Sequence, residues 1–182
     1  MISKTVLTQK RSDFPAVQDA LHQMQRDLLD GVREDLKSSG HRPGPDEKLG
    51  LSLWVYNPQR ETLTNWASAD RVWRDPNTLE PVPIDWRSDF VAVNAFCSGS
   101  VASQSTERHT SSRWNHVVGV PLYIESPDIG RLPVGVATLA STSPAPRSVL
   151  HRGLWTIRSK SLPTLETVLS GALDPYNTLS LG

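Results

Sequence analysis

The sequence predicts an α/β protein of the α+β kind, with a central antiparallel sheet of five to six strands and helices on both faces. Three observations support this. An apolar stripe at helical spacing runs from Val17 to Leu36, pairs of strand-like runs follow at 49–69 and 117–139, and a second helical pattern begins at Ser161. With 182 residues, the chain has the length of a single domain with a substantial core.

A long helix is expected within residues 1–40, after a loose leader at 1–11. Ser12 or Asp13 suits the N-cap, and Pro15 falls in the first turn, where a missing N–H is tolerated. The apolar stripe consists of Val17, Ala20, Leu21, Met24, Leu28, Val32 and Leu36. A stripe of this length either covers the sheet or pairs with a second copy of the chain.

The sheet and its cover are expected within residues 49–141. Leu49–Tyr56 alternates apolar and other residues, residues 57–60 (Asn-Pro-Gln-Arg) suit a turn, and 61–69 return as a second strand. The segment 70–88 is rich in turn-forming residues, which predicts irregular structure.

A short helix is expected from about Ser88 to Cys97. Its buried side is predicted to carry Phe90, Val93 and Phe96, and Gly99 is a suitable end. Cys97 is expected to be a small buried residue of the core. The segment 98–113 is rich in Ser and Thr, with a short strand predicted near 101–104.

The central feature is a predicted hairpin of two middle strands. Val117–Ile124 is rich in β-branched residues, residues 126–130 contain turn formers, and a second apolar run begins at Leu132. Strands this close in sequence pair antiparallel.

The two faces of this hairpin are expected to differ. A register that places Val120 beside Val134 or Val136 also places Gly119 on the same side as Gly135, which leaves one face bare of large side chains. A bare face admits either a closely packed helix or a ligand. Close helix packing is the favoured interpretation.

The remaining chain is expected to be a connector and a last helix. Residues 141–148 form the connector, and 149–160 fit a short helix or a loop. Ser161 suits the N-cap of a helix over 161–175, with Pro163 in its first turn.

The central hairpin and the residues before it carry a family pattern. The pattern comprises Ala95-Phe96-Cys97-Ser98-Gly99, Trp114, Pro121-Leu122 and Leu132-Pro133-Val134-Gly135-Val136. It resembles the signature of GAF domains, small sensor folds of signalling proteins. The resemblance covers about a third of the chain and implies a GAF/PAS-like fold in which the first and last helices lie side by side and often mediate dimerisation.

The resemblance also implies a place for a ligand, between one sheet face and a cover formed by residues 70–113. The implied site residues are Trp66, Phe96 and Trp114 as apolar walls, with Trp73 or Trp86 as further candidates, and Ser98 and Arg113 as polar groups. The alternative is that these aromatic residues belong to an ordinary core.

Composition excludes several classes of function. The chain contains 19 lysine and arginine residues and 19 aspartate and glutamate residues. Because the net charge is zero, no overall electrostatic field attracts nucleic acid, and nucleic acid is an unlikely partner. No stretch has the length of a membrane span, and the N-terminus lacks a signal peptide. A single cysteine excludes a disulfide framework and fits a cytoplasmic location.

Signatures of catalysis are missing from the sequence. There is no phosphate-binding glycine loop, no nucleophile elbow and no metal-ligand spacing, and His109 and His116 belong to different predicted elements. One branch of the GAF family reduces methionine sulfoxide through several cysteines, whereas Cys97 is alone here. Neither bilin attachment nor the cyclic-nucleotide motif is visible, so no cofactor or ligand is identified.

The interpretation is a non-catalytic sensory or regulatory domain that binds a small molecule or a partner protein and signals through a helix pair in a homodimer. The alternative is a structural adaptor without a ligand, and a sulfoxide-reductase-type enzyme is a third. One charge feature stays open: the segment Ile129–Leu165 contains five basic residues and no acid. Such a segment is either a solvated surface or a basic face for an anionic partner.

Overall fold

The computed structural model describes residues 14–68, 81–105, 113–126, 130–161, 163–164 and 167. The strands are β1 (Leu49–Asn57), β2 (Thr62–Ser68), β3 (Val82–Pro83), β4 (Ala102–Ser105), β5 (His116–Ser126) and β6 (Gly130–Ser141). The helices are α2 (Phe14–Ser38), α3 (Val91–Ser98), α4 (Val149–Arg152) and α5 (Leu154–Thr156), followed by the π-helical turn η2 (Ile157–Ser161). The predicted leader, the N-cap at Ser12 or Asp13, Trp73, His109 and most of the helix predicted at 161–175 lie outside the described residues.

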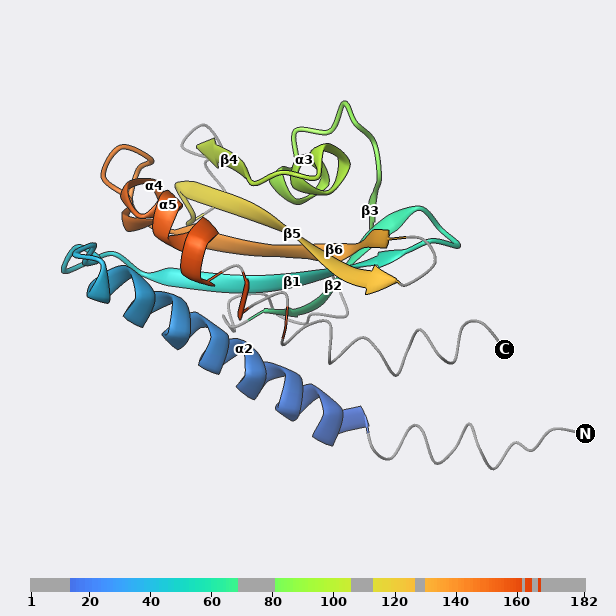
Figure 1. Ribbon diagram of the computed structural model, residues 1–182, viewed down its shortest axis with the longest axis horizontal. Coiled ribbons are helices and arrows are strands. Elements are labelled where there is room, and N and C mark those ends of the chain that lie inside the picture. The colour runs from blue at the N-terminus through green and yellow to red at the C-terminus, as the bar shows by residue number, and fades with distance from the viewer. Residues whose placement is uncertain are drawn as a thin grey trace, which may run out of the picture.

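All six strands form one antiparallel sheet in the order β3-β2-β1-β6-β5-β4 (Figure 1). This confirms the predicted sheet of five to six strands, and both strands of the predicted hairpin β5–β6 lie inside the sheet rather than at an edge. The edge strand β3 was not predicted, because a two-residue strand that contains a proline leaves no periodic pattern.

Helices cover both faces of the sheet, as predicted (Figure 1). One face carries α2 together with α4, α5 and η2, and its core contains Leu28, Val32, Leu36, Leu51, Leu53, Val118, Val120, Leu139, Leu150 and Ile157. The other face carries α3, and its core contains Trp54, Leu63, Ala92, Val93, Ala95 and Val136. Successive side chains of a strand point to opposite faces of the sheet, so the apolar residues of the strands contribute to two separate core clusters.

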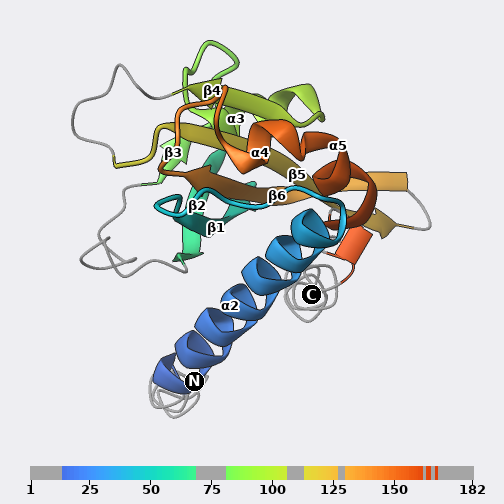
Figure 2. The same ribbon diagram turned by 90° about the vertical axis from the view of Figure 1, so that its left-hand side faces the viewer.

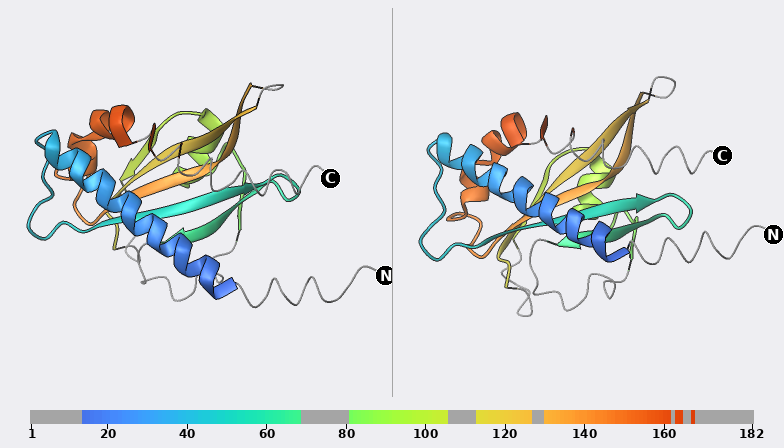
Figure 3. Two further views of the ribbon diagram at one scale, coloured as in Figure 1. Left: turned by 60° about the horizontal axis from the view of Figure 1, so that its bottom comes forward. Right: turned by 90° about the horizontal axis from the view of Figure 1, so that it is seen from below.

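The helix α2 crosses the first face diagonally (Figure 3) and its N-terminal part projects beyond the sheet (Figure 2). The helix ends where Gly40 adopts a left-handed backbone with φ 82°. The N–H of His41 donates to the carbonyl of Leu36 at 2.8 Å, and the N–H of Gly40 donates to that of Lys37 at 3.0 Å. This is a Schellman end, which satisfies the last carbonyl groups and turns the chain toward β1.

The register of the central hairpin differs from the prediction. Val120 pairs with Ala137 rather than with Val134 or Val136, and Gly119 pairs with Thr138. Gly135 pairs with Leu122, so Gly119 and Gly135 lie on opposite faces of the sheet. The predicted bare face is therefore wrong.

A β-bulge explains part of this difference. Leu122 pairs with Gly135 while Tyr123 pairs with Pro133, which leaves Val134 as an extra residue in β6. An extra residue reverses the alternation of faces on one side of the bulge, and simple periodicity does not reveal it.

The favoured interpretation of Gly119, close helix packing, agrees with the structure. A Cβ atom at Gly119 would lie 2.9 Å from the carbonyl oxygen of Val91 and 3.0 Å from Cβ of Ala95. Only glycine permits the backbone of α3 to come this close to β5.

The short helix α3 ends at Gly99, which has φ 62° and acts as its C-cap, as predicted. Its buried residues are Val91, Ala92, Val93 and Ala95, whereas Phe90 and Phe96 are half-buried. Cys97 is exposed, so its predicted burial is wrong. It follows Ala95 by two residues, and a rotation of about 200° places it on the side away from the sheet.

The segment 149–161 forms α4, α5 and η2, where a short helix or a loop was expected. Ser161 lies at the end of η2, and its hydroxyl donates to Oδ2 of Asp35 at 2.8 Å, which ties this segment to α2. Within the described ranges, no helix combines the length and the apolar content that crossing a bilayer requires.

Candidate functional site

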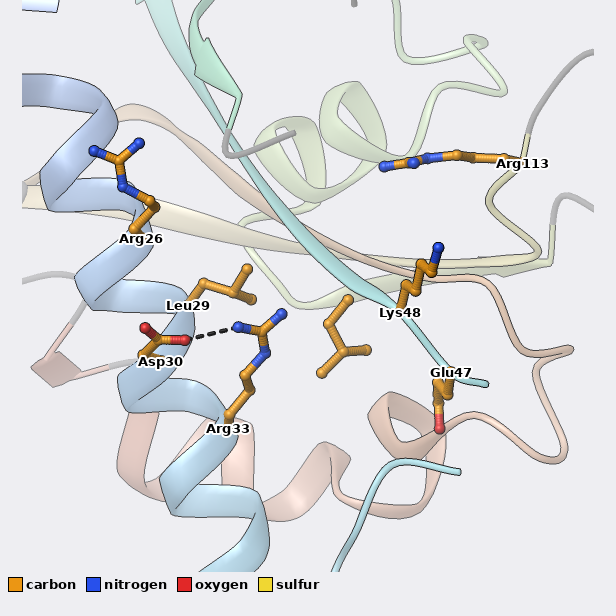
Figure 4. Close-up of a pocket in the computed structure, with 8 residues that line it drawn as sticks. Arg26, Leu29, Asp30, Arg33, Glu47, Lys48 and Arg113 are labelled. Carbon is orange, nitrogen blue, oxygen red and sulfur yellow. Dashed lines mark hydrogen bonds and ion pairs between the residues drawn. The ribbon is translucent and has the colours of Figure 1, made fainter. Parts of the chain in front are cut away.

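A groove of about 540 Å³ lies between α2 and the start of β1 (Figure 4). It is lined by Arg26, Leu29, Asp30 and Arg33 from α2, by Glu47, Lys48 and Leu49 at the start of β1, and by Arg113, which lies shortly before β5. Its volume falls in the range of small-molecule sites.

The wall on α2 arises from helical spacing. Arg26, Asp30 and Arg33 recur at intervals of four and three residues, so they lie along one side of the helix. Arg33 forms an exposed ion pair with Asp30 at 2.7 Å, and Arg26 donates to Oε1 of Gln23 at 2.7 Å. Leu29 is buried and forms part of the apolar core beneath this wall.

The opposite wall contains Lys48 and Arg113, whose charged ends lie across the groove from α2 (Figure 4). The guanidinium of Arg113 lies 4.2 Å from the centre of the Trp114 ring, a cation–π arrangement. The buried Trp114 ring lies against Gly50, where a Cβ atom would come within 2.8 Å of its Cη2. Partial burial lowers the pKa of Arg113, which nevertheless stays protonated at neutral pH.

The carboxylate of Glu47 is held by the backbone behind the groove. Its Oε1 accepts from the hydroxyl of Ser141 at 2.5 Å and from the N–H of Val149 at 2.9 Å, and its Oε2 accepts from the N–H of Gly44 at 3.1 Å. Among the described residues of the lining, four side chains are basic and two are acidic, of which Glu47 is bound to backbone and hydroxyl donors. The excess of positive charge favours an anionic occupant.

Two other hollows among the described residues are lined by fewer charged side chains than this groove. One of about 600 Å³ is lined by Ser105, Pro144, Ala145, Pro146 and Arg147, with a single charged group. One of about 270 Å³ lies between α2 and η2, and its two charged residues, Asp27 and Asp35, are both acidic. Asp35 accepts the hydrogen bond from Ser161, so it serves the packing of η2.

The site residues predicted from sequence occupy two regions. Phe96 packs against Tyr56 near the end of β1, with ring centres 4.7 Å apart, and Trp114 lies against Gly50 near the start of β1. Ser98 is exposed, and its hydroxyl contacts the carbonyl groups of Ala95 and Ser100, each at 3.4 Å. Arg113 is the predicted site residue that lines the groove.

Two predicted tryptophans add little to the site as described. The backbone of Trp66 is the extra residue of a β-bulge, since Leu53 pairs with Ala67 and Trp54 with Asn65, and its side chain lies outside the described residues. Trp86 is 74% exposed, beside the guanidinium of Arg87. Because parts of the predicted cover at 70–113 also lie outside the described residues, the pocket beneath it stays a prediction.

Sequence reasoning missed Arg26, Arg33 and Lys48. A weak signal exists, since Arg26 and Arg33 are seven residues apart in a helical stripe and therefore share a side. Nothing in the sequence places Lys48 or Arg113 opposite them, because that arrangement depends on the fold.

The basic segment 129–165 does not form one face. Arg131 stacks on Tyr123 in the β5–β6 hairpin at 4.1 Å from the ring centre. The helices α4 and α5 lie at the other end of the sheet (Figure 1). Arg152 of α4 donates to the carbonyl of Arg42 at 3.1 Å, and Lys160 of η2 donates to the hydroxyl of Ser39 at 3.1 Å. Arg131, Arg152 and Lys160 thus each contact a neighbouring group of the fold.

The thiol of Cys97 has an unfavourable environment for a nucleophile. Partial desolvation of the largely exposed thiol and the nearby Asp85 raise its pKa above the usual value for a thiol, which lowers the thiolate fraction. Within the described residues, no three His, Cys, Asp or Glu side chains gather in a way that holds a metal ion.

Comparison of the sequence with family models and with curated proteins finds no match. Comparison of the structure finds the GAF domain of an Acinetobacter phosphoenolpyruvate-protein phosphotransferase, with a TM-score of 0.51 and 15% sequence identity over 73% of this chain and 75% of the other. At this identity the likeness concerns the fold. The six-stranded sheet with helices on both faces is therefore a GAF-like fold, as the residues around the β5–β6 hairpin predicted.

Proposed function

We propose that this chain is a non-catalytic sensory or regulatory domain of the GAF type, which binds a small molecule or a partner and signals through a helix pair in a homodimer. The observation that carries the proposal is that α2 forms one wall of the basic groove while Lys48 and Arg113 form the other. An occupant that contacts both walls binds best at one position of α2. Its binding therefore shifts the population of helix positions.

The position of α2 supports a role in dimerisation. Its N-terminal part projects beyond the sheet (Figure 2), and the partly buried Met24 packs against the core cluster. In the sequence, the apolar stripe continues N-terminally from Met24 to Leu21, Ala20 and Val17. A second copy of the same helix would bury this extension of the stripe.

The experiment is a measurement of mass in solution by sedimentation for the wild-type chain and two variants. Val17→Glu places a charge in the apolar stripe, and Gln18→Glu adds the same charge at the neighbouring position outside it. The wild type and Gln18→Glu are expected to be dimers, and Val17→Glu is expected to dissociate. A monomeric wild type, or equal dimerisation of both variants, would refute the helix pair.

One observation favours the adaptor alternative, in which no ligand binds under the α3 side of the sheet. The Val91 carbonyl and Ala95 of α3 contact β5 directly at Gly119, so this part of the face is closed. An adaptor would keep its midpoint of thermal unfolding unchanged across a library of nucleotides and metabolites. A sensory domain would show a raised midpoint with its ligand, because a ligand of the folded state stabilises it.

A further inference from the structure

We infer that the groove between α2 and β1 binds a small organic polyanion, one that carries phosphate or carboxylate groups, through Arg33, Lys48 and Arg113. This deepens the proposed sensory function, on which it rests, by naming the chemical class of the ligand and the residues that hold it. The site differs from the one that the sequence placed under residues 70–113.

The first argument is charge. Arg26, Arg33, Lys48 and Arg113 line a single groove in a chain whose basic and acidic residues are equal in number, 19 each. Concentrating cations in one hollow of a neutral protein creates a local positive potential that a polyanion neutralises.

The second argument concerns the two acids of the groove. The carboxylate of Glu47 already accepts three hydrogen bonds, from Ser141, Val149 and Gly44. The pair between Arg33 and Asp30 is solvent-exposed, with 44% and 67% of the side chains accessible. Exposed pairs of this kind are weak, so the guanidinium of Arg33 can exchange Asp30 for a stronger anion.

The third argument is the type of cation. Guanidinium groups bind phosphate and carboxylate through two parallel N–H donors, and an ammonium group binds them as a point charge. Arg33 on α2 and Arg113 on the opposite wall present guanidinium groups on two sides of the groove, with Lys48 on the same wall as Arg113 (Figure 4). This arrangement suits an anion with at least two charged groups.

The fourth argument is the apolar floor. Leu29 and Leu49 belong to the main hydrophobic core and also line the groove. A ligand that places an organic part over these leucines and its anionic groups on the surrounding cations satisfies both kinds of surface. A volume of about 540 Å³ accommodates a small metabolite rather than an inorganic ion alone.

The test measures binding to the full chain by calorimetry and by thermal unfolding. Inorganic pyrophosphate and citrate are the probes for phosphate and carboxylate chemistry, and sodium chloride at equal ionic strength is the control for screening. Saturable binding of either probe, with a raised unfolding midpoint, is expected, and the tighter of the two identifies the anionic group. An effect that sodium chloride reproduces would overturn the inference.

The variants come in matched pairs. Arg113→Gln is compared with Arg87→Gln, since Arg87 also stacks beside a neighbouring tryptophan, with 4.7 Å from Cζ to the ring centre, but does not line the groove. Arg33→Gln is compared with Lys37→Gln, since Lys37 pairs with Glu34 three residues away on the same helix, outside the groove. Each groove variant is expected to weaken binding about tenfold, and each control to leave it unchanged.

Lys48→Met supplies a third groove variant, whose unbranched side chain is close to lysine in length and carries no charge. If all variants bound the probes with equal affinity, binding would be a diffuse effect of surface charge, and the proposed site would be wrong. A single-stranded oligonucleotide or a polyglutamate peptide that binds with higher affinity than both small probes, and competes with them, would also overturn the small-molecule assignment.

Failure of this inference can be told apart from failure of the proposed function. Dimerisation through α2 is measured by sedimentation of Val17→Glu and does not involve the groove. A dimer that binds neither probe saturably refutes the polyanion site and leaves the helix pair standing. A monomer that binds pyrophosphate through Arg33 and Arg113 refutes the helix pair alone.

Discussion

The carboxylate of Glu47 accepts a hydrogen bond from the backbone N–H of Val149 at 2.9 Å, although the two residues are 102 positions apart in the chain. Val149 is the first residue of α4, and the same Oε1 atom accepts from Ser141 at the end of β6. One half-buried carboxylate therefore joins the start of β1, the end of β6 and the start of α4. A negative charge at this helix end also satisfies N–H groups that have no partner within the helix.

Removal of this carboxylate is expected to destabilise the fold. Glu47→Ala loses three hydrogen bonds to a charged group and is expected to lower the free energy of unfolding by about 2–4 kcal/mol. Chemical denaturation at pH 7 measures the change. Asp46→Asn is the control, because Asp46 is an exposed neighbouring acid, and it is expected to change stability by less than about 0.5 kcal/mol. Equal effects of both substitutions would contradict the role of Glu47.

The buried His116 predicts a dependence of stability on pH. Its Nε2 lies 2.9 Å from the hydroxyl of Ser103, while its buried Nδ1 has no hydrogen-bond partner within the described part of the chain. Burial lowers the pKa of His116 below its usual value, His151 lowers it further, and Glu47 acts in the opposite direction. The unfolded chain therefore takes up a proton near pH 6.5 that the folded chain does not bind at that pH.

The contribution of His116 to the free energy of unfolding is expected to be at its maximum above about pH 6.5 and to fall as the pH decreases below that value. Denaturation midpoints between pH 5 and 8 measure the effect. His116→Gln is expected to flatten the profile in this range. His151→Gln is expected to keep most of it, because burial is the larger cause of the shift. A profile that rises toward acid pH would show that the sign is wrong.

Substitution of glycine by alanine is expected to have opposite effects on stability at Gly119 and at Gly31. At Gly119 a new Cβ would lie 2.9 Å from the Val91 carbonyl, so Gly119→Ala must push α3 away from the sheet and is expected to cost about 1–3 kcal/mol. At Gly31, inside α2, a new Cβ meets nothing within 4 Å. Gly31→Ala is expected to stabilise the protein by about 0.5–1 kcal/mol through helix propensity. Thermal unfolding of both variants checks the pair, and destabilisation by Gly31→Ala would contradict the open environment.

The sequence predicted the fold where patterns are local. The β-branched run of β5 and the stripe of α2 each contain enough apolar residues to define an element and its buried side. The register of β5 on β6 was not predictable, because the bulge at Val134 changes the pairing without changing the composition. Burial of Cys97 was wrongly predicted, because the short helix α3 buries one side only.

The basic groove was harder to predict than the fold. Its residues come from positions 26–33, 47–49 and 113, and only the packing of α2 across the sheet brings these segments together. Arg113 was predicted as a polar group of a different pocket, the one under residues 70–113. In the structure its guanidinium stacks on the adjacent Trp114. No feature of the sequence marks Lys48 as a residue of a binding site.

Gln25 is expected to reduce the stability of the fold. Its side chain is fully buried in α2, and neither its Nε2 nor its Oε1 has a hydrogen-bond partner among the residues that the structure describes. A buried amide without partners costs free energy relative to an apolar group of similar shape, so Gln25→Met is expected to raise the free energy of unfolding by about 1–2 kcal/mol. Gln23→Met is the control on the same helix, because Gln23 is exposed, donates to Asp27 at 2.7 Å and accepts from Arg26 at 2.7 Å. Urea denaturation compares the two, and a loss of stability in Gln25→Met would mean that the native amide contributes favourable hydrogen bonds.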